Sequence, residues 1–346
     1  MASRTSRIDW VLFFALGFFW GSSYLFIKIG VETVTPFTLI AGRLLVGSLL
    51  LVVALRLSHA TLPREPKMYG HLFVMALINI VIPFSLITWG ETTLDSGLAA
   101  ILTSTVPLFT IVLAALFLID EPMRVNRVVG LAIGFVGVVV ITAPSLDPSA
   151  RGDLPGEIAL ILAAVSYAAG NVYARRNVRG LKPIIPPFFQ VFFAFLVTGT
   201  LAVVFENPLA IDYQPSSILS IVWLGLLGSG LAYLVFFRLL AAWGSTRSSL
   251  VAYLLPVVGI VLGAVVLGET IAPEMIAGTA LVVGGIAATN SRRGQRRLFG
   301  RSPEPIAADA AAGQTAVPTA TASAQVGSPV QAGSQTGVQA ALGEAD

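Results

Sequence analysis

One arginine lies inside an apolar segment, where a charge is costly. Arg43 falls about seven residues into the run 37–57, which places it roughly 10 Å below the end of a helix. An arginine at the centre of a membrane helix costs about 2.5–3.5 kcal/mol on insertion scales, so it must face the interior or find a partner. Its planar donors could bind a carboxylate through two hydrogen bonds. A structural bond to backbone carbonyls, or a side chain that reaches the headgroups, is the alternative interpretation.

Aromatic and amide side chains recur at helical spacing in two apolar segments. Trp20 and Tyr24 precede Lys28 on one helix face, and Tyr167 precedes Asn171 on another. Such faces are costly against lipid and suit a wet cavity. The alternative is that the aromatic rings only pack between helices. Lys28 lies near the end of its segment, so we expect its ammonium group to reach the headgroups.

Further polar residues lie within other apolar segments. Asn79 falls in the middle of the third segment, where an amide contacts either a solute or a neighbouring helix. Gln190 is the neutral counterpart of Arg43 in the second half of the chain. The predicted substrate-binding residues are Trp20, Tyr24, Arg43, Asn79, Ser104, Tyr167, Asn171, Gln190 and Tyr253.

Two prolines are expected in the middle of spanning helices. Pro107 and Pro256 would each remove one backbone hydrogen bond and free the carbonyl four residues earlier, at Thr103 and Ala252. We predict that these paired kinks are gating points at which the two helices flex. The alternative is that proline is simply common in membrane helices.

The sequence predicts neither an enzyme nor a metal or cofactor site. It has no cysteine, and its two histidines lie in or beside a short polar loop. We find no zinc-binding HExxH pair, no phosphate-binding glycine loop and no acidic cluster, so no catalytic residue is predicted. Glu91 and Asp95 lie near a segment boundary, and no acid lies deep in a span. Facilitated exchange or uniport is therefore favoured, with coupling through the boundary acids as the other option.

Composition places the chain in a membrane. It is 55% hydrophobic and only 11% charged, which is too apolar for a soluble protein of 346 residues. A spanning helix needs roughly 20 apolar residues. The predicted spans are 10–30, 37–57, 70–90, 97–118, 125–143, 157–174, 185–205, 217–240, 248–268 and 274–290.

The basic residues predict the orientation of these ten spans. With the N-terminus in the cytoplasm, 18 of the 21 Lys and Arg residues fall in inside segments. Only Arg151 falls outside, while Lys28 and Arg43 lie within spans. The division predicts that both termini are cytoplasmic.

The second half of the chain repeats the first. Trp20, Lys28, Pro36 and Arg43 have the same order and spacing as Tyr167, Arg175, Pro183 and Gln190, and Pro107, Glu121, Gly130 and Gly137 correspond to Pro256, Glu269, Gly278 and Gly285. Each repeat holds five spans, and an odd number inverts the second copy. Secondary transporters commonly have such inverted repeats, with the binding site between them.

Loop charges agree with the inversion. The loop after the second span carries Arg56, Arg64 and Lys67, whereas its counterpart after the seventh carries Glu206 and Asp212. Homologous loops are therefore expected on opposite sides of the membrane.

The sequence thus predicts an all-α integral membrane fold with ten transmembrane helices in two inverted five-helix repeats. Its predicted parts are a cytoplasmic N-terminal segment (1–9), a first repeat (10–143), a periplasmic linker (144–156), a second repeat (157–290), and a basic cluster with a disordered cytoplasmic tail (291–346).

These segments resemble the EamA-type ten-helix exporters of the drug/metabolite transporter superfamily. The resemblance rests on Trp20-Gly21-Ser22-Ser23-Tyr24, Lys28, Pro36, Arg43, Pro107, Glu121 and their second-half counterparts, and it covers about residues 8–290. It implies an exporter of amino acids or related small metabolites, with a central cavity. The chain departs from the family at Tyr167, where a second Trp is frequent.

The expected function is alternating-access export of a small molecule across a bacterial inner membrane. A carrier of sugar or nucleoside-type metabolites is the first alternative, and a channel, scramblase or receptor is the second. The expected partners are the solute and the lipid bilayer, without nucleic acid, and the protein is expected to be a monomer or homodimer.

Overall fold

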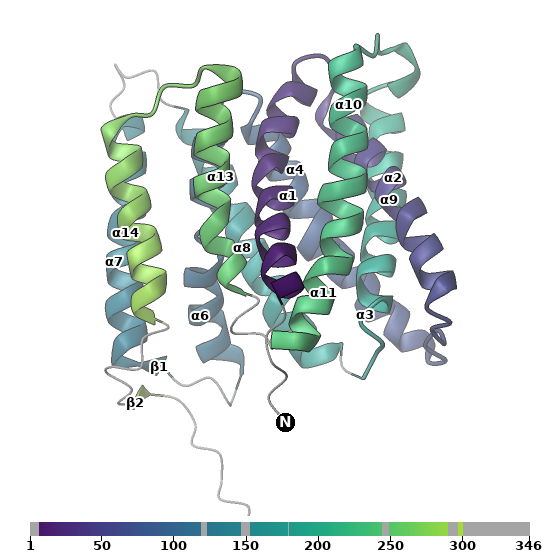
Figure 1. Ribbon diagram of the computed structural model, residues 1–346, viewed down its shortest axis with the longest axis horizontal. Coiled ribbons are helices and arrows are strands. Elements are labelled where there is room, and N and C mark those ends of the chain that lie inside the picture. The colour runs from purple at the N-terminus through teal and green to yellow at the C-terminus, as the bar shows by residue number, and fades with distance from the viewer. Residues whose placement is uncertain are drawn as a thin grey trace, which may run out of the picture. The chain divides into compact units, whose positions relative to one another are not determined.

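The computed structural model describes residues 7–118, 123–146, 153–178, 180–243, 249–289 and 297–299 (Figure 1). Predictions for Glu121 and for the C-terminal tail lie outside these residues. The described chain is almost entirely helical, because a helix satisfies its own backbone hydrogen bonds in hydrocarbon.

Among its described residues, the first half contains seven α-helices and two shorter helical segments. They are α1 (Arg7–Val31), α2 (Pro36–Leu57), α3 (Pro66–Ala76), the π-helical η1 (Leu77–Val81), α4 (Ile82–Gly90), α5 (Ser96–Thr103), α6 (Val106–Phe117), α7 (Val125–Thr142) and the 3₁₀ turn η2 (Ala143–Leu146). Helices α3, η1 and α4 form one continuous span.

The second half follows a similar order. Its elements are α8 (Leu154–Asn177), α9 (Ile185–Phe205), the 3₁₀ turn η3 (Pro208–Ala210), α10 (Pro215–Trp223), the π-helical η4 (Leu224–Leu231), α11 (Ala232–Trp243), the 3₁₀ segment η5 (Ser249–Tyr253), α13 (Leu254–Leu262), the π-helical η6 (Gly263–Leu267) and α14 (Pro273–Thr289). Pro36, Pro66, Pro215 and Pro273 each begin a helix, a position where the missing N–H costs nothing.

Eight helical segments of the described chain are long and apolar enough to cross a membrane. Two shorter apolar helices, Val251–Leu267 and Pro273–Thr289, fall where the ninth and tenth spans are predicted. The membrane class therefore agrees with the sequence, while the count of ten spans stays a prediction.

Extended structure in the described residues is confined to one short antiparallel pair. Strand β1 (Met123–Arg124) precedes α7, and it pairs with β2 (Arg297–Phe299), which follows α14. The purely helical prediction did not include this pairing. It forms where the two chain segments leave the neighbouring helices α7 and α14.

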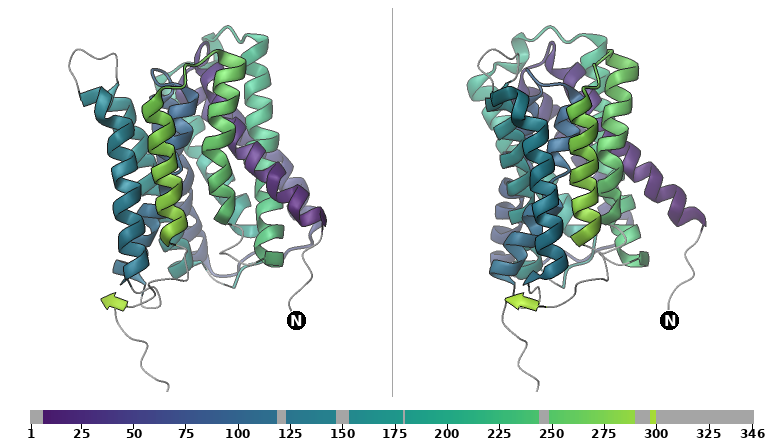
Figure 2. Two further views of the ribbon diagram at one scale, coloured as in Figure 1. Left: turned by 60° about the vertical axis from the view of Figure 1, so that its left-hand side comes forward. Right: turned by 90° about the vertical axis from the view of Figure 1, so that its left-hand side faces the viewer.

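The helices pack so that segments far apart in sequence become neighbours. Helices α7 and α14 lie side by side at one edge, and α2 lies against α9 towards the other (Figures 1 and 2). Figure 2 shows that α1 leans relative to the other helices. The largest cluster of buried apolar side chains joins α5 to α1, α4, α7 and α8.

Glycines allow the close approach of α7 and α14. A Cβ atom at Gly285 would lie 2.5 Å from the backbone nitrogen of Gly134 and 2.6 Å from the carbonyl oxygen of Gly130. Backbone atoms cannot move aside as a flexible side chain can. Small residues therefore set this helix spacing.

We expect Gly285→Ala to destabilise the protein by about 1–3 kcal/mol, as overpacking a close contact does. The matched control is Gly284→Ala, because a Cβ at Gly284 would meet no atom within 4 Å. Melting temperatures of the purified protein in detergent would measure both variants. Equal melting temperatures for the two variants would contradict the packing role of Gly285.

Candidate functional site

Arg43 is held inside the bundle by one hydrogen bond and one aromatic ring. Its side chain is only 4% exposed, and its Nε donates to Ser229 Oγ in η4 at 3.2 Å. The guanidinium carbon lies 4.3 Å from the ring centroid of Phe84, a cation–π contact. The structure gives the two terminal nitrogens no hydrogen-bond partner among the described residues. These terminal donors are the ones that can bind a carboxylate bidentately.

Three tyrosines lie within electrostatic range of this guanidinium. Tyr24 of α1, Tyr167 of α8 and Tyr233 of α11 all lie close enough to Arg43 to interact with its charge. The indole ring of Trp20 packs against Tyr233, with ring centroids 6.4 Å apart. Phenol groups supply both donors and acceptors, and their rings offer apolar surface. The helices α1, α2, α8 and α11 thus bring together four predicted site residues and Tyr233.

Asn79 and Gln190 bond mainly to each other and to the backbone. Asn79 Nδ2, in η1, donates to Gln190 Oε1 at 3.2 Å, and Gln190 Nε2 donates to the Pro186 carbonyl oxygen at 3.2 Å. Asn79 Oδ1 is buried and accepts no hydrogen bond in the described chain. Gly170 makes room for this amide, since a Cβ there would overlap it. The pair links the predicted third and seventh spans. Asn79 therefore contacts a neighbouring helix, which was one of its two predicted roles.

Lys28 does not reach out to the headgroups, so that expectation was wrong. Its Nζ donates to the carbonyl oxygens of Glu91 and Leu94, at 3.0 and 2.7 Å. These carbonyls follow the C-terminal end of α4, where acceptors lack helical partners. The contact ties α1 to the loop 91–95.

Glu91 is the most deeply buried acid of the site. Its side chain is 0% exposed, and neither carboxylate oxygen has a hydrogen-bond partner in the described chain. Burial raises the pKa of Glu91 well above its ordinary value; Lys28 opposes this rise and Glu269 adds to it. Burial also raises the pKa of Asp95, and the charge of Glu269 acts in the same direction.

Two other acids at this end of the bundle are fully satisfied. Glu206 accepts hydrogen bonds from the backbone nitrogens of Phe37 and Thr38, at 2.9 and 2.7 Å, and from the hydroxyl of Thr35 at 2.7 Å. It therefore caps the N-terminus of α2, where free N–H groups favour a negative charge.

Glu269 makes the same kind of cap on another helix. Its carboxylate accepts from the backbone nitrogens of Ser96 and Gly97, at 2.7 and 3.0 Å, and from Ser96 Oγ at 3.0 Å. The capped helix, α5, belongs to the first half of the chain. We call the end formed by the loops 91–95, 206–214 and 268–272 the acidic end.

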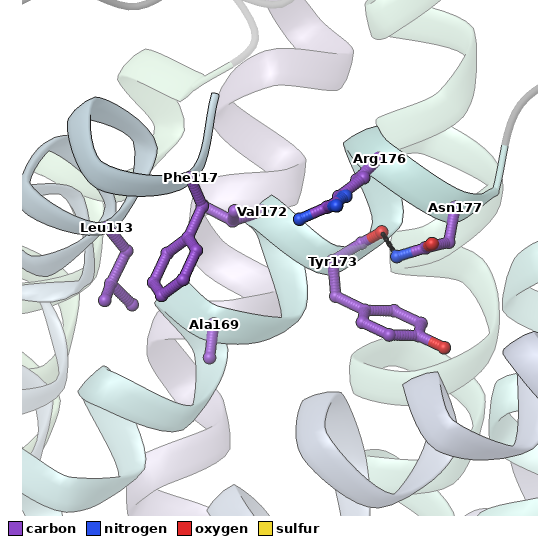
Figure 3. A pocket seen from close by; sticks show the side chains of 7 residues that line it. All are labelled: Leu113, Phe117, Ala169, Val172, Tyr173, Arg176 and Asn177. Carbon is purple, nitrogen blue, oxygen red and sulfur yellow. Dashed lines mark hydrogen bonds between the residues drawn. The ribbon is translucent and has the colours of Figure 1, made fainter. Parts of the chain in front are cut away.

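A pocket of about 400 Å³ lies between α6 and α8 (Figure 3). Its lining residues are Leu113, Phe117, Ala169, Val172, Tyr173, Arg176 and Asn177. Figure 3 shows Asn177 bonded to the Tyr173 carbonyl oxygen, at 3.0 Å, with Arg176 nearby. None of the predicted site residues lines this pocket. The polar spacing of residues 173, 176 and 177 on one helical face was the signal for it.

The remaining predicted residues are more dispersed. Ser104 is buried and donates to the Ile101 carbonyl oxygen at 2.6 Å, whereas Tyr253 is partly buried against the largest apolar cluster. Asn171 has an exposed side chain. A role for each of them in binding stays a prediction.

The two prolines lie at helix starts, not within unbroken helices. Helix α5 ends at Thr103 and α6 begins at Val106, so Pro107 lies in the first turn of a new helix. Pro256 likewise lies in the first turns of α13, directly after a 3₁₀ segment. The expected breaks are present, while their role in gating is untested.

Sequence reasoning missed Ser229, Tyr233 and Phe84 as site residues. It placed Glu91 near a segment boundary and did not include it in the predicted site. Gly228-Ser229-Gly230 was the available signal, since small polar residues within a span favour close helix contact. Among the described residues, no group of three or more His, Cys, Asp or Glu side chains could hold a metal ion.

Three curated relatives match this chain over most of their own length. The uncharacterized transporter YoaV of Bacillus subtilis is 24% identical over 77% of this chain and 91% of its own. Protein PagO of Salmonella typhimurium is 27% identical over 79% and 90%. The uncharacterized inner membrane transporter YedA of Escherichia coli K12 is 29% identical over 75% and 82%.

A solved crystal structure shares the fold. It superimposes with a TM-score of 0.60 at 21% identity, covering 82% of this chain and 96% of the other. The sequence profile of the EamA-like transporter family matches residues 9–143 and 154–291, almost the whole helical part. The chain therefore belongs to the EamA-like transporter family.

Proposed function

We propose that this protein is a secondary transporter that exports amino acids or related small metabolites across a bacterial inner membrane by alternating access. The main support for the proposal is the environment of Arg43. A buried guanidinium whose terminal nitrogens lack protein partners, within electrostatic range of Tyr24, Tyr167 and Tyr233, suits the carboxylate of a solute. The aromatic rings suit an apolar or aromatic side chain next to that carboxylate.

The contacts between helices support an inverted-repeat layout for 10–143 and 157–290. Helix α2 packs on α9, α5 on α13, and α7 on α14, and each pair joins a predicted span to its own counterpart. The other large contacts come in exchanged pairs, such as α1 with α13 and α8 with α6. Exchanging the two halves therefore leaves the contact pattern nearly unchanged, as a two-fold axis requires.

Local backbone features also recur at corresponding positions of the two halves. His59 and Asn207, 148 positions apart, are the non-glycine residues of the described chain with a positive φ. The π-helical segments η1 and η4 occupy corresponding places in the third and eighth predicted spans. π-helical segments often occur at functional sites. Here they carry Asn79, which bonds to Gln190, and Ser229, which accepts a hydrogen bond from Arg43.

The two ends of the bundle differ in a way that suits one stage of alternating access. At the acidic end, Glu206 and Glu269 tie residues of the second half to helices α2 and α5 of the first. The pocket at Tyr173 and Arg176 lies near the opposite end of α8. We assign the acidic end to the periplasmic side and both termini to the cytoplasm, following the positive-inside rule. The structure then represents a form closed to the outside.

Arg43 gives a direct test of solute binding. We expect Arg43→Gln to raise the half-saturation concentration for L-leucine by about 10–100-fold, since a hydrogen bond to a charged group contributes about 1.5–3 kcal/mol. Counterflow of radiolabelled L-leucine in proteoliposomes measures it. Leucinol, which lacks the carboxylate, should compete weakly with L-leucine in the wild type and show no such disadvantage in the variant.

The matched control is Arg56→Gln, which removes an exposed arginine from the same helix. It should leave the half-saturation concentration unchanged. If a panel of amino acids gives no saturable counterflow with the wild-type protein, amino-acid export is wrong.

Glu269 gives a test of closure at the acidic end. Because the chain has no cysteine, Ser23→Cys provides a single thiol. It would lie beside Arg43, since Ser23 and Arg43 both face Gly228. Glu269→Gln weakens the charged cap on α5, so we expect a membrane-impermeant maleimide added from outside to label this thiol about tenfold faster, the factor for roughly 1.4 kcal/mol.

Glu274→Gln is the control for this labelling experiment, because it removes a charge from the first turn of α14. Its labelling rate should match that of the Ser23→Cys parent in right-side-out vesicles. Equal rates for the Glu269 and Glu274 variants would show that the cap does not hold this end closed.

A further inference from the structure

Glu91 is a buried acid for which the described residues provide no hydrogen-bond donor. Its side chain is fully buried, and both carboxylate oxygens lack hydrogen-bond partners among the described residues. Glu206 and Glu269, at the same end, instead receive several backbone N–H groups each. Three glutamates in one region thus have two different environments. A carboxylate without donors is costly to bury, whereas a neutral carboxyl costs far less.

The nearby cations do not satisfy the Glu91 carboxylate. The Lys28 ammonium group of α1 is used by the carbonyl oxygens of Glu91 and Leu94. The Arg43 guanidinium of α2 donates to Ser229. Both cations lie close enough to act on Glu91 through space, and Glu269 acts with the opposite sign.

Position on the helix disfavours the charged form as well. Glu91 is the C-cap of α4, where the helix dipole is negative and repels a carboxylate. The Tyr24 hydroxyl of α1 is the other titratable group that interacts with it. The raised pKa of Glu91 agrees with this geometry. Burial, the missing donors and the helix end all favour the neutral carboxylic acid in the closed form, and Tyr24 and Arg43 lie within electrostatic range of it.

The two halves are unequal at this position. By the 149-residue spacing of Pro107 and Pro256, Glu91 corresponds to Leu240 in the second half. An apolar residue therefore stands at the equivalent place, so the repeat itself does not require an acid at position 91.

We infer that Glu91 is a proton-binding site that exchanges a proton for the solute, which makes export an antiport with proton entry. The inference rests on the proposed function. With the solute carboxylate on Arg43, the solute ammonium group and a proton compete for the Glu91 carboxylate.

The exchange balances without another reactant. When solute enters from the cytoplasm, the Glu91 carboxyl gives its proton to water, forming a carboxylate and a hydronium ion, and the ammonium group takes the place of the proton. When the acidic end opens, the solute leaves and the carboxylate takes a proton from outside. The closed, neutral form then returns. This replaces the facilitated mechanism that the absence of a mid-span acid favoured.

The test follows lumenal pH and solute in the same proteoliposomes. Vesicles loaded with L-leucine and a trapped pH-sensitive dye are diluted into leucine-free buffer. We expect the lumen to acidify during efflux through the wild-type protein. With Glu91→Gln, saturable leucine counterflow should persist with weaker affinity, but without acidification. Wild-type half-saturation should rise as pH falls, by at most about tenfold per unit for one competing proton, and that of the variant should not.

The outcomes separate the two claims. Wild-type leucine efflux without acidification, lumenal alkalinisation, or acidification that persists in Glu91→Gln would overturn the antiport and leave the transporter proposal standing. Absence of wild-type counterflow would overturn the proposed function and the coupling with it.

A measurement without solute checks the protonation state itself. Infrared spectra of the purified protein at neutral pH should contain a protonated-carboxyl band that Glu91→Gln diminishes. The control is Glu269→Gln, which should leave this band in place, because the Glu269 carboxylate already accepts hydrogen bonds from backbone N–H groups. A wild-type spectrum identical to that of Glu91→Gln in this region would overturn the inference.

Discussion

A guanidinium enclosed by apolar helices is the constraint on which the rest of the site depends. Arg43 cannot lose its proton, so the fold must supply groups that tolerate its charge. The bundle does so with a serine from a π-helical segment, the face of Phe84 and a set of phenols. These groups come from both halves of the chain, and they hold the cation without consuming its terminal donors. The remaining bonding capacity is what a solute can use.

The same low-dielectric interior explains the contrast among the acids. Glu206 and Glu269 accept hydrogen bonds from the free N–H groups at helix starts. Glu91 lies at a helix end of the opposite polarity and receives no donor from the described chain. One residue type therefore serves as a structural cap at two places and as a titratable group at a third. The backbone dipole, more than the side chain, decides which.

The repeats share a backbone but not their charges. Paired π segments, paired positive-φ residues and reciprocal glycine contacts recur between the halves. Arg43 corresponds to Gln190, and Glu91 corresponds to leucine. Each half needs the backbone features that maintain its helix packing, whereas a single solute needs only one set of charged side chains. A site built on a near-symmetric frame can therefore be electrically one-sided.

Much of the site was predictable because its signals are local. Arg43 in an apolar run, the Trp20 and Tyr24 stripe and the tyrosine at 167 all appear in single segments, and the structure brings them together. Lys28 was misjudged because its partners lie more than 60 positions away, in the loop after α4. Asn79 likewise finds Gln190 more than 100 positions along the chain, and Asn171 lies on an exposed surface that spacing alone does not reveal.

The sequence by itself determined the membrane class, the family and the presence of a costly interior cation, because hydropathy and residue order are properties of the chain. Only the tertiary structure decided which polar groups are satisfied. Whether a carboxylate is capped, as in Glu269, or left without donors, as in Glu91, depends on which helix end packs against it. That partner comes from a distant part of the chain, so no local pattern records it.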